Sequence, residues 1–161
     1  MSVNKYKPHV YVIPEDEADR QIADGFILHS RVVSRQVQVV APAGGWSRVL
    51  DTFKEEYVPL LNNKYTHVVL LIDFDGNPDE RRNRVVAEVP EELRSRVFVI
   101  GPRDQPEALK QALNQSCEAI GTSLANDCAD NNAATWAHEH LQHNEDERVR
   151  LTNAVRPFLF N

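Results

Sequence analysis

Two groups of carboxylates follow apolar segments of this 161-residue chain. Residues 67–72, HVVLLI, are mostly aliphatic, and Asp73 and Asp75 come directly after them. Glu15 and Asp19 stand in the same way after the first apolar segment of the chain. Carboxylates that meet in a fold repel one another unless a cation compensates. Because oxygen ligands select hard ions, the two groups together predict a site for Mg²⁺ or Mn²⁺.

The elements that would position these acids alternate along the chain. Short, continuously apolar segments predict buried strands, and each is followed by a segment with apolar residues at helical spacing. Four such repeats predict an α/β fold in which a four-stranded, mostly parallel sheet carries helices on both faces. We expect strands over residues 9–13, 36–42, 67–72 and 96–100, and helices over residues 15–29, 44–61, 78–89 and 105–120.

A parallel sheet of this kind binds ligands beyond the carboxyl ends of its strands, where the strand order reverses. If the order is 2-1-3-4, the first and third strands are neighbours. Glu15 would then face Asp73 and Asp75. A simpler interpretation stays open, in which the aspartates only end their strand and cap the next helix.

The chain reads as one domain over residues 1–161, with an α/β core over 8–120 and a C-terminal helical appendage over 130–161. The segment 126–132, NDCADNN, is polar and predicts a turn. The motif HEHLQH offers three histidines, of which two would share a helical face. No cysteine stands at zinc-like spacing, which argues against a zinc site. The histidines are His138, His140 and His143.

Composition limits the classes of partner. The net charge of -6 and the pI of about 5.5 argue against broad adhesion to nucleic acid or membranes, but they allow a local basic patch. The N-terminus lacks the apolar core of a signal peptide, and the longest aliphatic run, VVLLI, is too short to span a bilayer. Two cysteines without a CxxC motif are typical of reduced thiols, so we expect a cytoplasmic protein with no membrane partner.

The carboxylates resemble a known pattern. Glu15 and Asp19 after the first strand, with Asp73-x-Asp75 after the third, are similar to the topoisomerase-primase (Toprim) domain over residues 8–115. Similar members include small bacterial proteins and the nuclease domains of the overcoming-lysogenization-defect family. The resemblance implies Mg²⁺ or Mn²⁺ held by all four acids. It also implies phosphodiester chemistry on nucleic acid, most simply cleavage, with Glu15, Asp73 and Asp75 as the catalytic residues and Glu15 as general acid or base.

Three other interpretations share the local signal. The Toprim pattern usually has glycine after its glutamate, where this chain has Asp16, and this departure favours a catalytically silent module that binds a protein partner in a larger system. Response-regulator receivers also carry acids after the first strand and an aspartate after the third, but they need a lysine after a fifth strand, which we do not find. The run DFDGN resembles the nucleophile motif of haloacid-dehalogenase-like phosphatases, which follows their first strand and usually has threonine or valine at the position of Asn77.

Basic and glycine residues flank the acids. Arg81, Arg82 and Arg84 follow Asp75 closely and are candidates to contact nucleic-acid phosphates; the alternative is a solvated helix face. Gly44 and Gly45 precede a predicted helix, whose N-terminus would then be open to a phosphate; the alternative is a plain loop.

Overall fold

Four parallel strands form the centre of the structure, a computed structural model that describes residues 2–161 of the chain. They lie in the order β2-β1-β3-β4, so the predicted α/β fold is confirmed and β1 and β3 are neighbours. β1, β3 and β4 are short and mostly apolar, and residues on both of their faces are buried, as expected for a sheet covered on both sides. The strands are β1 (His9–Pro14), β2 (Val37–Val39), β3 (Thr66–Leu71) and β4 (Val97–Ile100).

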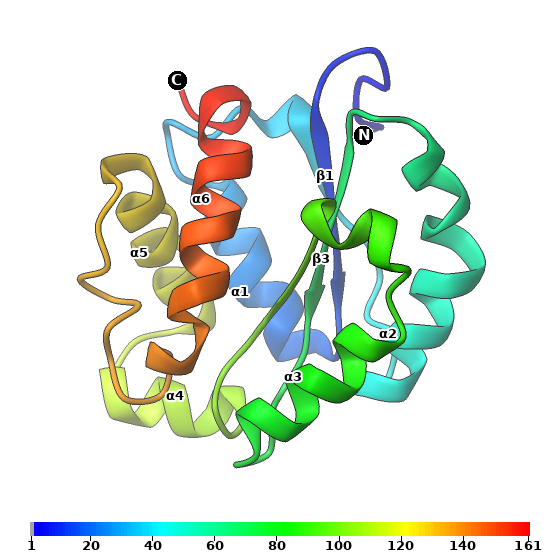
Figure 1. The fold of residues 1–161 in the computed structure, drawn as a ribbon. Coiled ribbons are helices and arrows are strands. Elements are labelled where there is room, and N and C mark those ends of the chain that lie inside the picture. Colours follow the sequence, from blue (N-terminus) through cyan, green and yellow to red (C-terminus); the bar gives the residue numbers. More distant parts are fainter. Residues whose placement is uncertain (1) are drawn as a thin grey trace.

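Helices cover both faces of this sheet (Figure 1). Helices α1, α5 and α6 lie on one side of the strands, while α2 and α3 lie on the other. Within the described residues, no helix is long and apolar enough to cross a membrane. The helices are α1 (Glu17–Ile27), α2 (Trp46–Thr52), α3 (Pro78–Ala87), α4 (Pro106–Leu113), α5 (Cys117–Asp130) and α6 (Glu145–Leu159).

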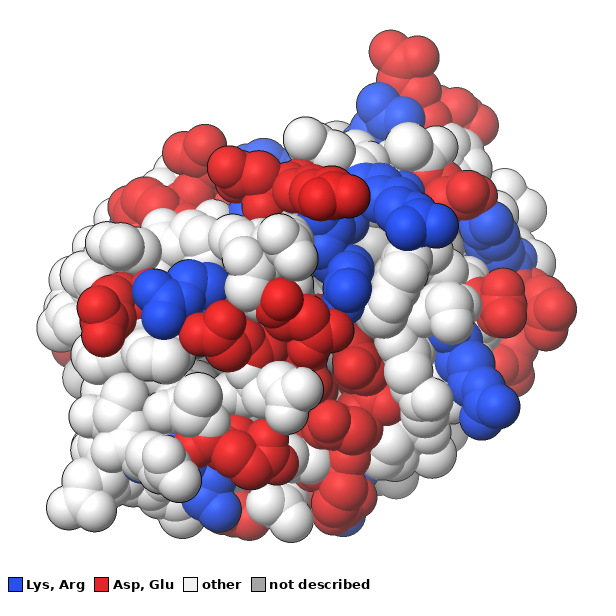
Figure 2. All heavy atoms as spheres, turned by 90° about the horizontal axis from the view of Figure 1, so that it is seen from below, with Lys and Arg blue, Asp and Glu red and all other residues white. Residues whose placement is uncertain are grey.

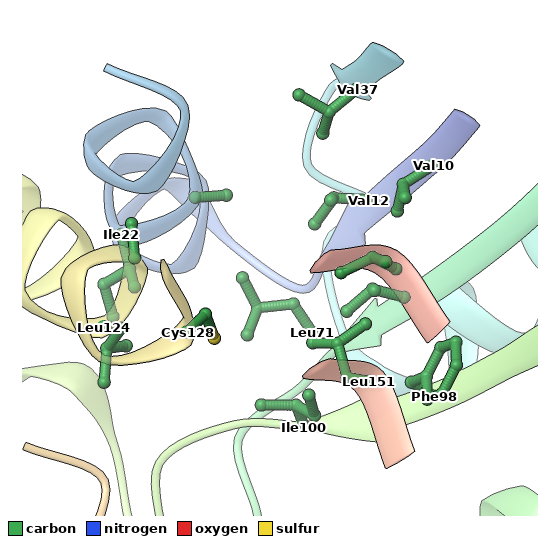
Figure 3. Packing of buried hydrophobic residues seen from close by; sticks show 14 of the residues in the cluster. Val10, Val12, Ile22, Val37, Leu71, Phe98, Ile100, Leu124, Cys128 and Leu151 are labelled. Atoms are coloured by element: carbon green, nitrogen blue, oxygen red, sulfur yellow. The ribbon is translucent and has the colours of Figure 1, made fainter. Parts of the chain in front are cut away.

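The larger core lies between the sheet and the helices α1, α5 and α6. Figure 3 shows Ile22 of α1 beside Leu124 of α5, with Leu71 and Ile100 of the sheet facing them. A cavity of about 90 Å³ remains in this layer. Because apolar side chains line it and no charged group does, it is a packing void and not a candidate catalytic site.

Two glycines, one on each helix, allow α1 and α5 to lie close together. A Cβ atom on Gly121 would overlap the carbonyl oxygen of Ile22, and one on Gly25 would overlap the backbone of Glu118. Thr122 Oγ1 donates a hydrogen bond of 3.0 Å to the Gly25 carbonyl at the same crossing. The absence of side chains at both glycines therefore sets the distance between the two helices.

The second helix of the prediction changes character along its length. Helix α2 ends at Thr52 and is followed by a π-helical turn, Phe53–Tyr57, and a 3-10 turn, Pro59–Asn62. Phe53 and Leu61 are fully buried against the second face of the sheet. Phe53 lies at the start of the wider turn, and Leu61 lies in the 3-10 turn that begins at Pro59, a residue that cannot donate to the hydrogen-bond ladder.

The prediction of a single helix over residues 105–120 is wrong. Asn114 adopts the left-handed conformation with φ 51° and ends α4. Ser116 then begins α5 by accepting a hydrogen bond of 3.1 Å from the Ala119 N–H. An asparagine and a serine two residues apart are the stop and start signals that produce this break.

The polar segment 126–132 also differs from its prediction, because most of it is the last part of α5 and not a turn. Asp127 is buried, and its Oδ2 accepts hydrogen bonds from the backbone N–H groups of Thr135 (2.6 Å) and Trp136 (3.3 Å). The Asp127 carboxylate therefore pairs with backbone N–H groups of the following loop inside the protein.

The C-terminal helix α6 packs on the sheet and covers the outer edge of β4. Leu151 and Val155 belong to the larger core. Glu147 Oε2 accepts a hydrogen bond of 2.8 Å from the Val99 N–H, and Arg150 donates one of 2.8 Å to the Val97 carbonyl. These side chains take the place of a fifth strand, so the backbone groups of the β4 edge are paired and not left open.

Candidate metal centre

Pairing between β1 and β3 places Glu15 beside the start of the Asp-x-Asp motif. Pro14 and Leu71 are partners in the register of the two strands. Just beyond them, the Glu15 N–H donates a hydrogen bond of 2.8 Å to the Leu71 carbonyl. The Asp73 N–H in turn donates one of 3.1 Å to Glu15 Oε1. The sheet register therefore fixes Glu15 against Asp73, as the sequence predicted.

Three carboxylates meet at this point. Glu15, Asp16 and Asp73 each offer an oxygen, and these oxygens lie within 4.8 Å of one another. Asp16 also caps α1, because its Oδ1 accepts a hydrogen bond of 3.0 Å from the Asp19 N–H. Asp16 was read in the sequence only as a departure from the Toprim pattern. Its position directly after a strand end was the signal that could have identified it as a candidate ligand.

A fourth carboxylate lies buried next to the cluster. Asp19, in the first turn of α1, is 0% exposed, and neither of its oxygens has a hydrogen-bond partner among residues 2–161. Asp73 is 3% exposed, and its Oδ1 also lacks a partner. Buried polar atoms are nearly always paired in folded proteins, so three orphaned oxygens in one place indicate a missing positive partner or a retained proton.

Burial and mutual repulsion govern the titration of these acids. Burial, followed by repulsion from Asp73, raises the pKa of Asp19 far above its ordinary range. Burial, together with the neighbouring Glu15, also raises the pKa of Asp73. The pKa of the half-buried Glu15 carboxyl is also raised, mainly by burial. Without a cation, Asp19 therefore keeps a proton at neutral pH, because two adjacent buried charges cannot both be sustained.

A divalent cation fits this set of donors. All the donor atoms are carboxylate oxygens, which suit Mg²⁺ and Mn²⁺ and do not favour softer metals. The orphaned oxygens of Asp19 and Asp73 provide the negative charge that such an ion would compensate. Within residues 2–161, Glu15, Asp16 and Asp73 are the only group of three or more acids, histidines or cysteines arranged so that it could hold a metal ion.

Asp75, a predicted ligand, lies outside this group. Its backbone is left-handed, with φ 49°, and Gly76 continues the turn at φ 82°. Its Oδ2 accepts a hydrogen bond of 3.0 Å from Arg81, and its side chain is 42% exposed. The turn thus directs Asp75 toward Arg81, while Asp73 stays buried beside Glu15.

The three predicted phosphate-binding arginines have different environments. Arg82 donates to the carbonyls of Val99 (3.3 Å) and His143 (2.7 Å), so its guanidinium connects α3 to β4 and the C-terminal segment. Arg81 donates a hydrogen bond of 2.9 Å to the Asp73 carbonyl besides its bond to Asp75. Arg84 is exposed and has no hydrogen bond or ion pair within the described part of the chain.

The glycine loop after β2 supports Glu15. Gly44 and Gly45 have φ angles of 93° and 142°, which side chains rarely adopt. Their N–H groups both donate to the Glu15 carbonyl, at 2.9 and 3.3 Å. Because these donors are occupied, the loop positions the glutamate and does not present free N–H groups to a phosphate.

The histidines of the C-terminal segment have internal partners. His143 Nε2 donates a hydrogen bond of 2.7 Å to the Gly101 carbonyl, and its ring stands edge-on to Phe74. His140 lies 3.7 Å from Asp104 and stacks on His138. In the region that the structure describes, these three side chains form no metal-binding group.

Acidic and basic residues are interleaved on the surface at the carboxyl end of the sheet. Figure 2 looks onto the lower end of the molecule of Figure 1, where acidic residues occupy much of the middle and basic residues lie singly among them and along one side. The visible face has no continuous basic track. Any contact with a polyanion here must therefore use a few specific cations.

The chain matches no protein-family model and no curated protein. The Toprim resemblance therefore depends on four acids. The structure brings Glu15 and Asp73 together with Asp19 next to them, and it places Asp75 on Arg81.

Proposed function

We propose that this chain is a Toprim-like domain whose carboxylate cluster binds Mg²⁺ or Mn²⁺ and that performs phosphodiester chemistry on nucleic acid, most simply cleavage. The observation that carries the proposal is the orphaned oxygens of buried Asp19 and Asp73 beside Glu15. They lie beyond the carboxyl ends of two neighbouring parallel strands, which is the usual ligand position in such sheets.

Asp16 and Asp73 would hold the ion, together with one oxygen of Glu15. A bound divalent cation would neutralise the phosphate and stabilise the leaving oxygen. Asp19 would provide the negative charge behind these ligands, because it faces both Asp16 and Asp73. Arg81, which donates to the Asp73 carbonyl, would keep the end of β3 in place.

Glu15 is the residue best suited to move a proton. The Asp73 N–H holds its Oε1, and no hydrogen bond within residues 2–161 holds its Oε2. Burial raises the pKa of its carboxyl, which favours general acid–base work. The hydrogen bonds of Gly44 and Gly45 to its carbonyl would keep the side chain at the sheet edge.

The experiment compares Glu15→Gln with Glu17→Gln on labelled DNA and RNA, in Mg²⁺ and in Mn²⁺. General acid–base help is worth about 10² to 10⁴ in rate, so Glu15→Gln should lose nearly all cleavage. Glu17 is the matched control, because its exposed side chain pairs with Arg20 and not with the cluster. Absence of cleavage by the unaltered protein on every substrate would reject the nuclease.

A catalytically silent metal-binding module is the second candidate. The ion pair between Asp75 and Arg81 favours it, because it removes from the cluster an acid that the Toprim resemblance implies is catalytic. Such a module would bind Mn²⁺ through Glu15, Asp16 and Asp73 and cleave nothing. The cleavage assay and a metal-binding assay together distinguish the two candidates.

A further inference from the structure

Two exposed arginines beside the carboxylate cluster have no hydrogen-bond or ion-pair partner in the described part of the chain. Most arginines of the chain pair with carboxylates or donate to backbone carbonyls. Over residues 2–161, only Arg35, Arg48 and Arg84 have neither a hydrogen bond nor an ion pair. Arg35 lies in the 3-10 turn directly before β2, so it lies at the amino end of the strands, away from the cluster. The occupied arginines are Arg20, Arg31, Arg81, Arg82, Arg94, Arg96, Arg103, Arg148, Arg150 and Arg156.

We propose that Arg48, which lies over the glycine loop, and Arg84, which is positioned by Trp46, bind backbone phosphates of a nucleic acid beside the metal centre. This inference deepens the proposed function and rests on it for the identity of the polyanion. It replaces Arg82, whose guanidinium is occupied inside the protein, with Arg48, which the sequence did not suggest.

Trp46 connects the unpaired Arg84 to the metal centre. The Arg81 guanidinium lies 4.6 Å from the centre of the Trp46 ring, and that of Arg84 lies 5.2 Å from it. Arg81 also donates to Asp73 and Asp75, so the ring stands directly next to the turn that follows β3. A guanidinium that contacts a ring through its face keeps its N–H donors free at its edge. Arg84 is therefore oriented, charged and available.

Arg48 reaches the same region from α2. Its side chain passes over the glycine loop: a Cβ on Gly44 would lie 3.3 Å from Arg48 Nη1 and 3.7 Å from its Cδ. The Gly44 N–H donates to the Glu15 carbonyl. One unpaired guanidinium thus lies on the Glu15 side of the cluster, and the other lies next to the Asp73 side.

Phosphate is the ligand that this arrangement favours. Guanidinium groups bind phosphate oxygens through paired N–H donors, and two of them at separate positions suit successive phosphates of one strand. The chain carries a net charge of -6, so a polyanion is repelled from the protein as a whole. Local cations that have no internal partner are therefore needed to bring the backbone to the carboxylates.

The test measures binding of a fluorescently labelled single-stranded oligonucleotide in EDTA, where no metal contributes and no cleavage occurs. Arg48→Ala with Arg84→Ala should weaken binding at least tenfold. It should also lower the slope of log affinity against log salt by about 1.4, since each phosphate contact on a single strand contributes about 0.7. The matched control is Lys7→Ala with Arg35→Ala, which removes the same charge at the amino ends of β1 and β2. It should change the affinity less than twofold.

Intrinsic fluorescence tests whether the oligonucleotide reaches Trp46, beside which Arg84 lies. The oligonucleotide should change the emission of the protein, and Trp46→Phe should remove that change, because the other tryptophan, Trp136, is buried at 3% exposure. Equal weakening by the two double variants would overturn the inference, and so would inorganic phosphate that competes as well as the oligonucleotide does. Because Mn²⁺ binding is measured separately, failure here is distinguishable from failure of the metal centre.

Discussion

Replacing the buried Asp19 with asparagine should stabilise the metal-free protein at neutral pH. The carboxyl is 0% exposed, lacks any hydrogen-bond partner and faces Asp16 and Asp73. In the unfolded chain it ionises at its ordinary pKa of 3.8, whereas the folded protein keeps it protonated. Asparagine has the same shape and no charge, and its amide can donate to the neighbouring carboxylates.

The size of the effect follows from the pH interval. From 3.8 to pH 7 is about three units, and each unit is worth about 1.4 kcal/mol, so the cost of keeping Asp19 protonated reaches about 4 kcal/mol. The folded pKa is raised, so the folded state binds more protons than the unfolded state above pH 3.8, and its stability falls as pH rises. The gain from Asp19→Asn should therefore be about 2 to 4 kcal/mol at pH 7 and about 40% of that at pH 5, where the interval is about 1.2 units.

Urea unfolding in EDTA at pH 5 and pH 7 measures both values. The matched control is Asp51→Asn on α2, which makes the same chemical change at an exposed position and should alter stability by less than about 0.5 kcal/mol. A loss of stability on Asp19→Asn, or a gain that does not grow with pH, would refute the assignment of Asp19 as a carboxyl that is buried without a partner.

Three further predictions concern the scaffold. Glu147→Ala should lower the free energy of unfolding in urea by about 1 to 3 kcal/mol, because the Val99 N–H at the β4 edge loses its acceptor. Alanine at the exposed neighbour Asp146 should cost less than about 1 kcal/mol. Equal costs would contradict the edge contact. Gly121→Ala should cost about 1 to 3 kcal/mol, since its Cβ would overlap the Ile22 carbonyl, and an unchanged melting temperature would disprove the close crossing of α1 and α5. Burial lowers the pKa of His143 to about 4, so its neutral form supports the fold fully above pH 6.5, and this support, up to about 3 kcal/mol, should disappear as pH falls from 6.5 to 4. His143→Gln should flatten the stability profile in that interval, and a profile as steep as that of the unaltered protein would contradict the assignment.

The strands were predictable because their signal is local, whereas their order was assumed from a common arrangement of parallel sheets. Apolar runs such as residues 67–72 are continuous, and a strand buried on both faces allows few polar residues. The meeting of Glu15 and Asp73 followed from the strand order alone. Helix boundaries were less predictable where one residue decides, as at Asn114, whose left-handed backbone separates α4 from α5.

Polar residues were misjudged where their partners are distant in sequence. Asp127 accepts a hydrogen bond from a loop eight residues later, and the Arg82 guanidinium reaches His143. The sequence instead placed Asp127 in a turn and offered Arg82 as a phosphate contact. Asp16 belongs to the carboxylate cluster and Asp75 does not, which is the reverse of the prediction. The left-handed turn at Asp75 and the capping of α1 by Asp16 decide this, and neither could be read from the sequence. The spacing of acids after predicted strands indicates which residues gather at the carboxyl end of a sheet. The direction of each side chain there depends on such turns.

Titration with Mn²⁺ in a calorimeter tests the metal centre most directly. The unaltered protein should bind one Mn²⁺ per chain, and Asp73→Asn should abolish the binding, because it removes a ligand from the group of Glu15, Asp16 and Asp73. Asp75→Asn should retain it, because the Asp75 side chain lies on Arg81. Absence of binding at millimolar Mn²⁺, or binding that survives Asp73→Asn, would contradict the assignment of this carboxylate cluster as a metal site.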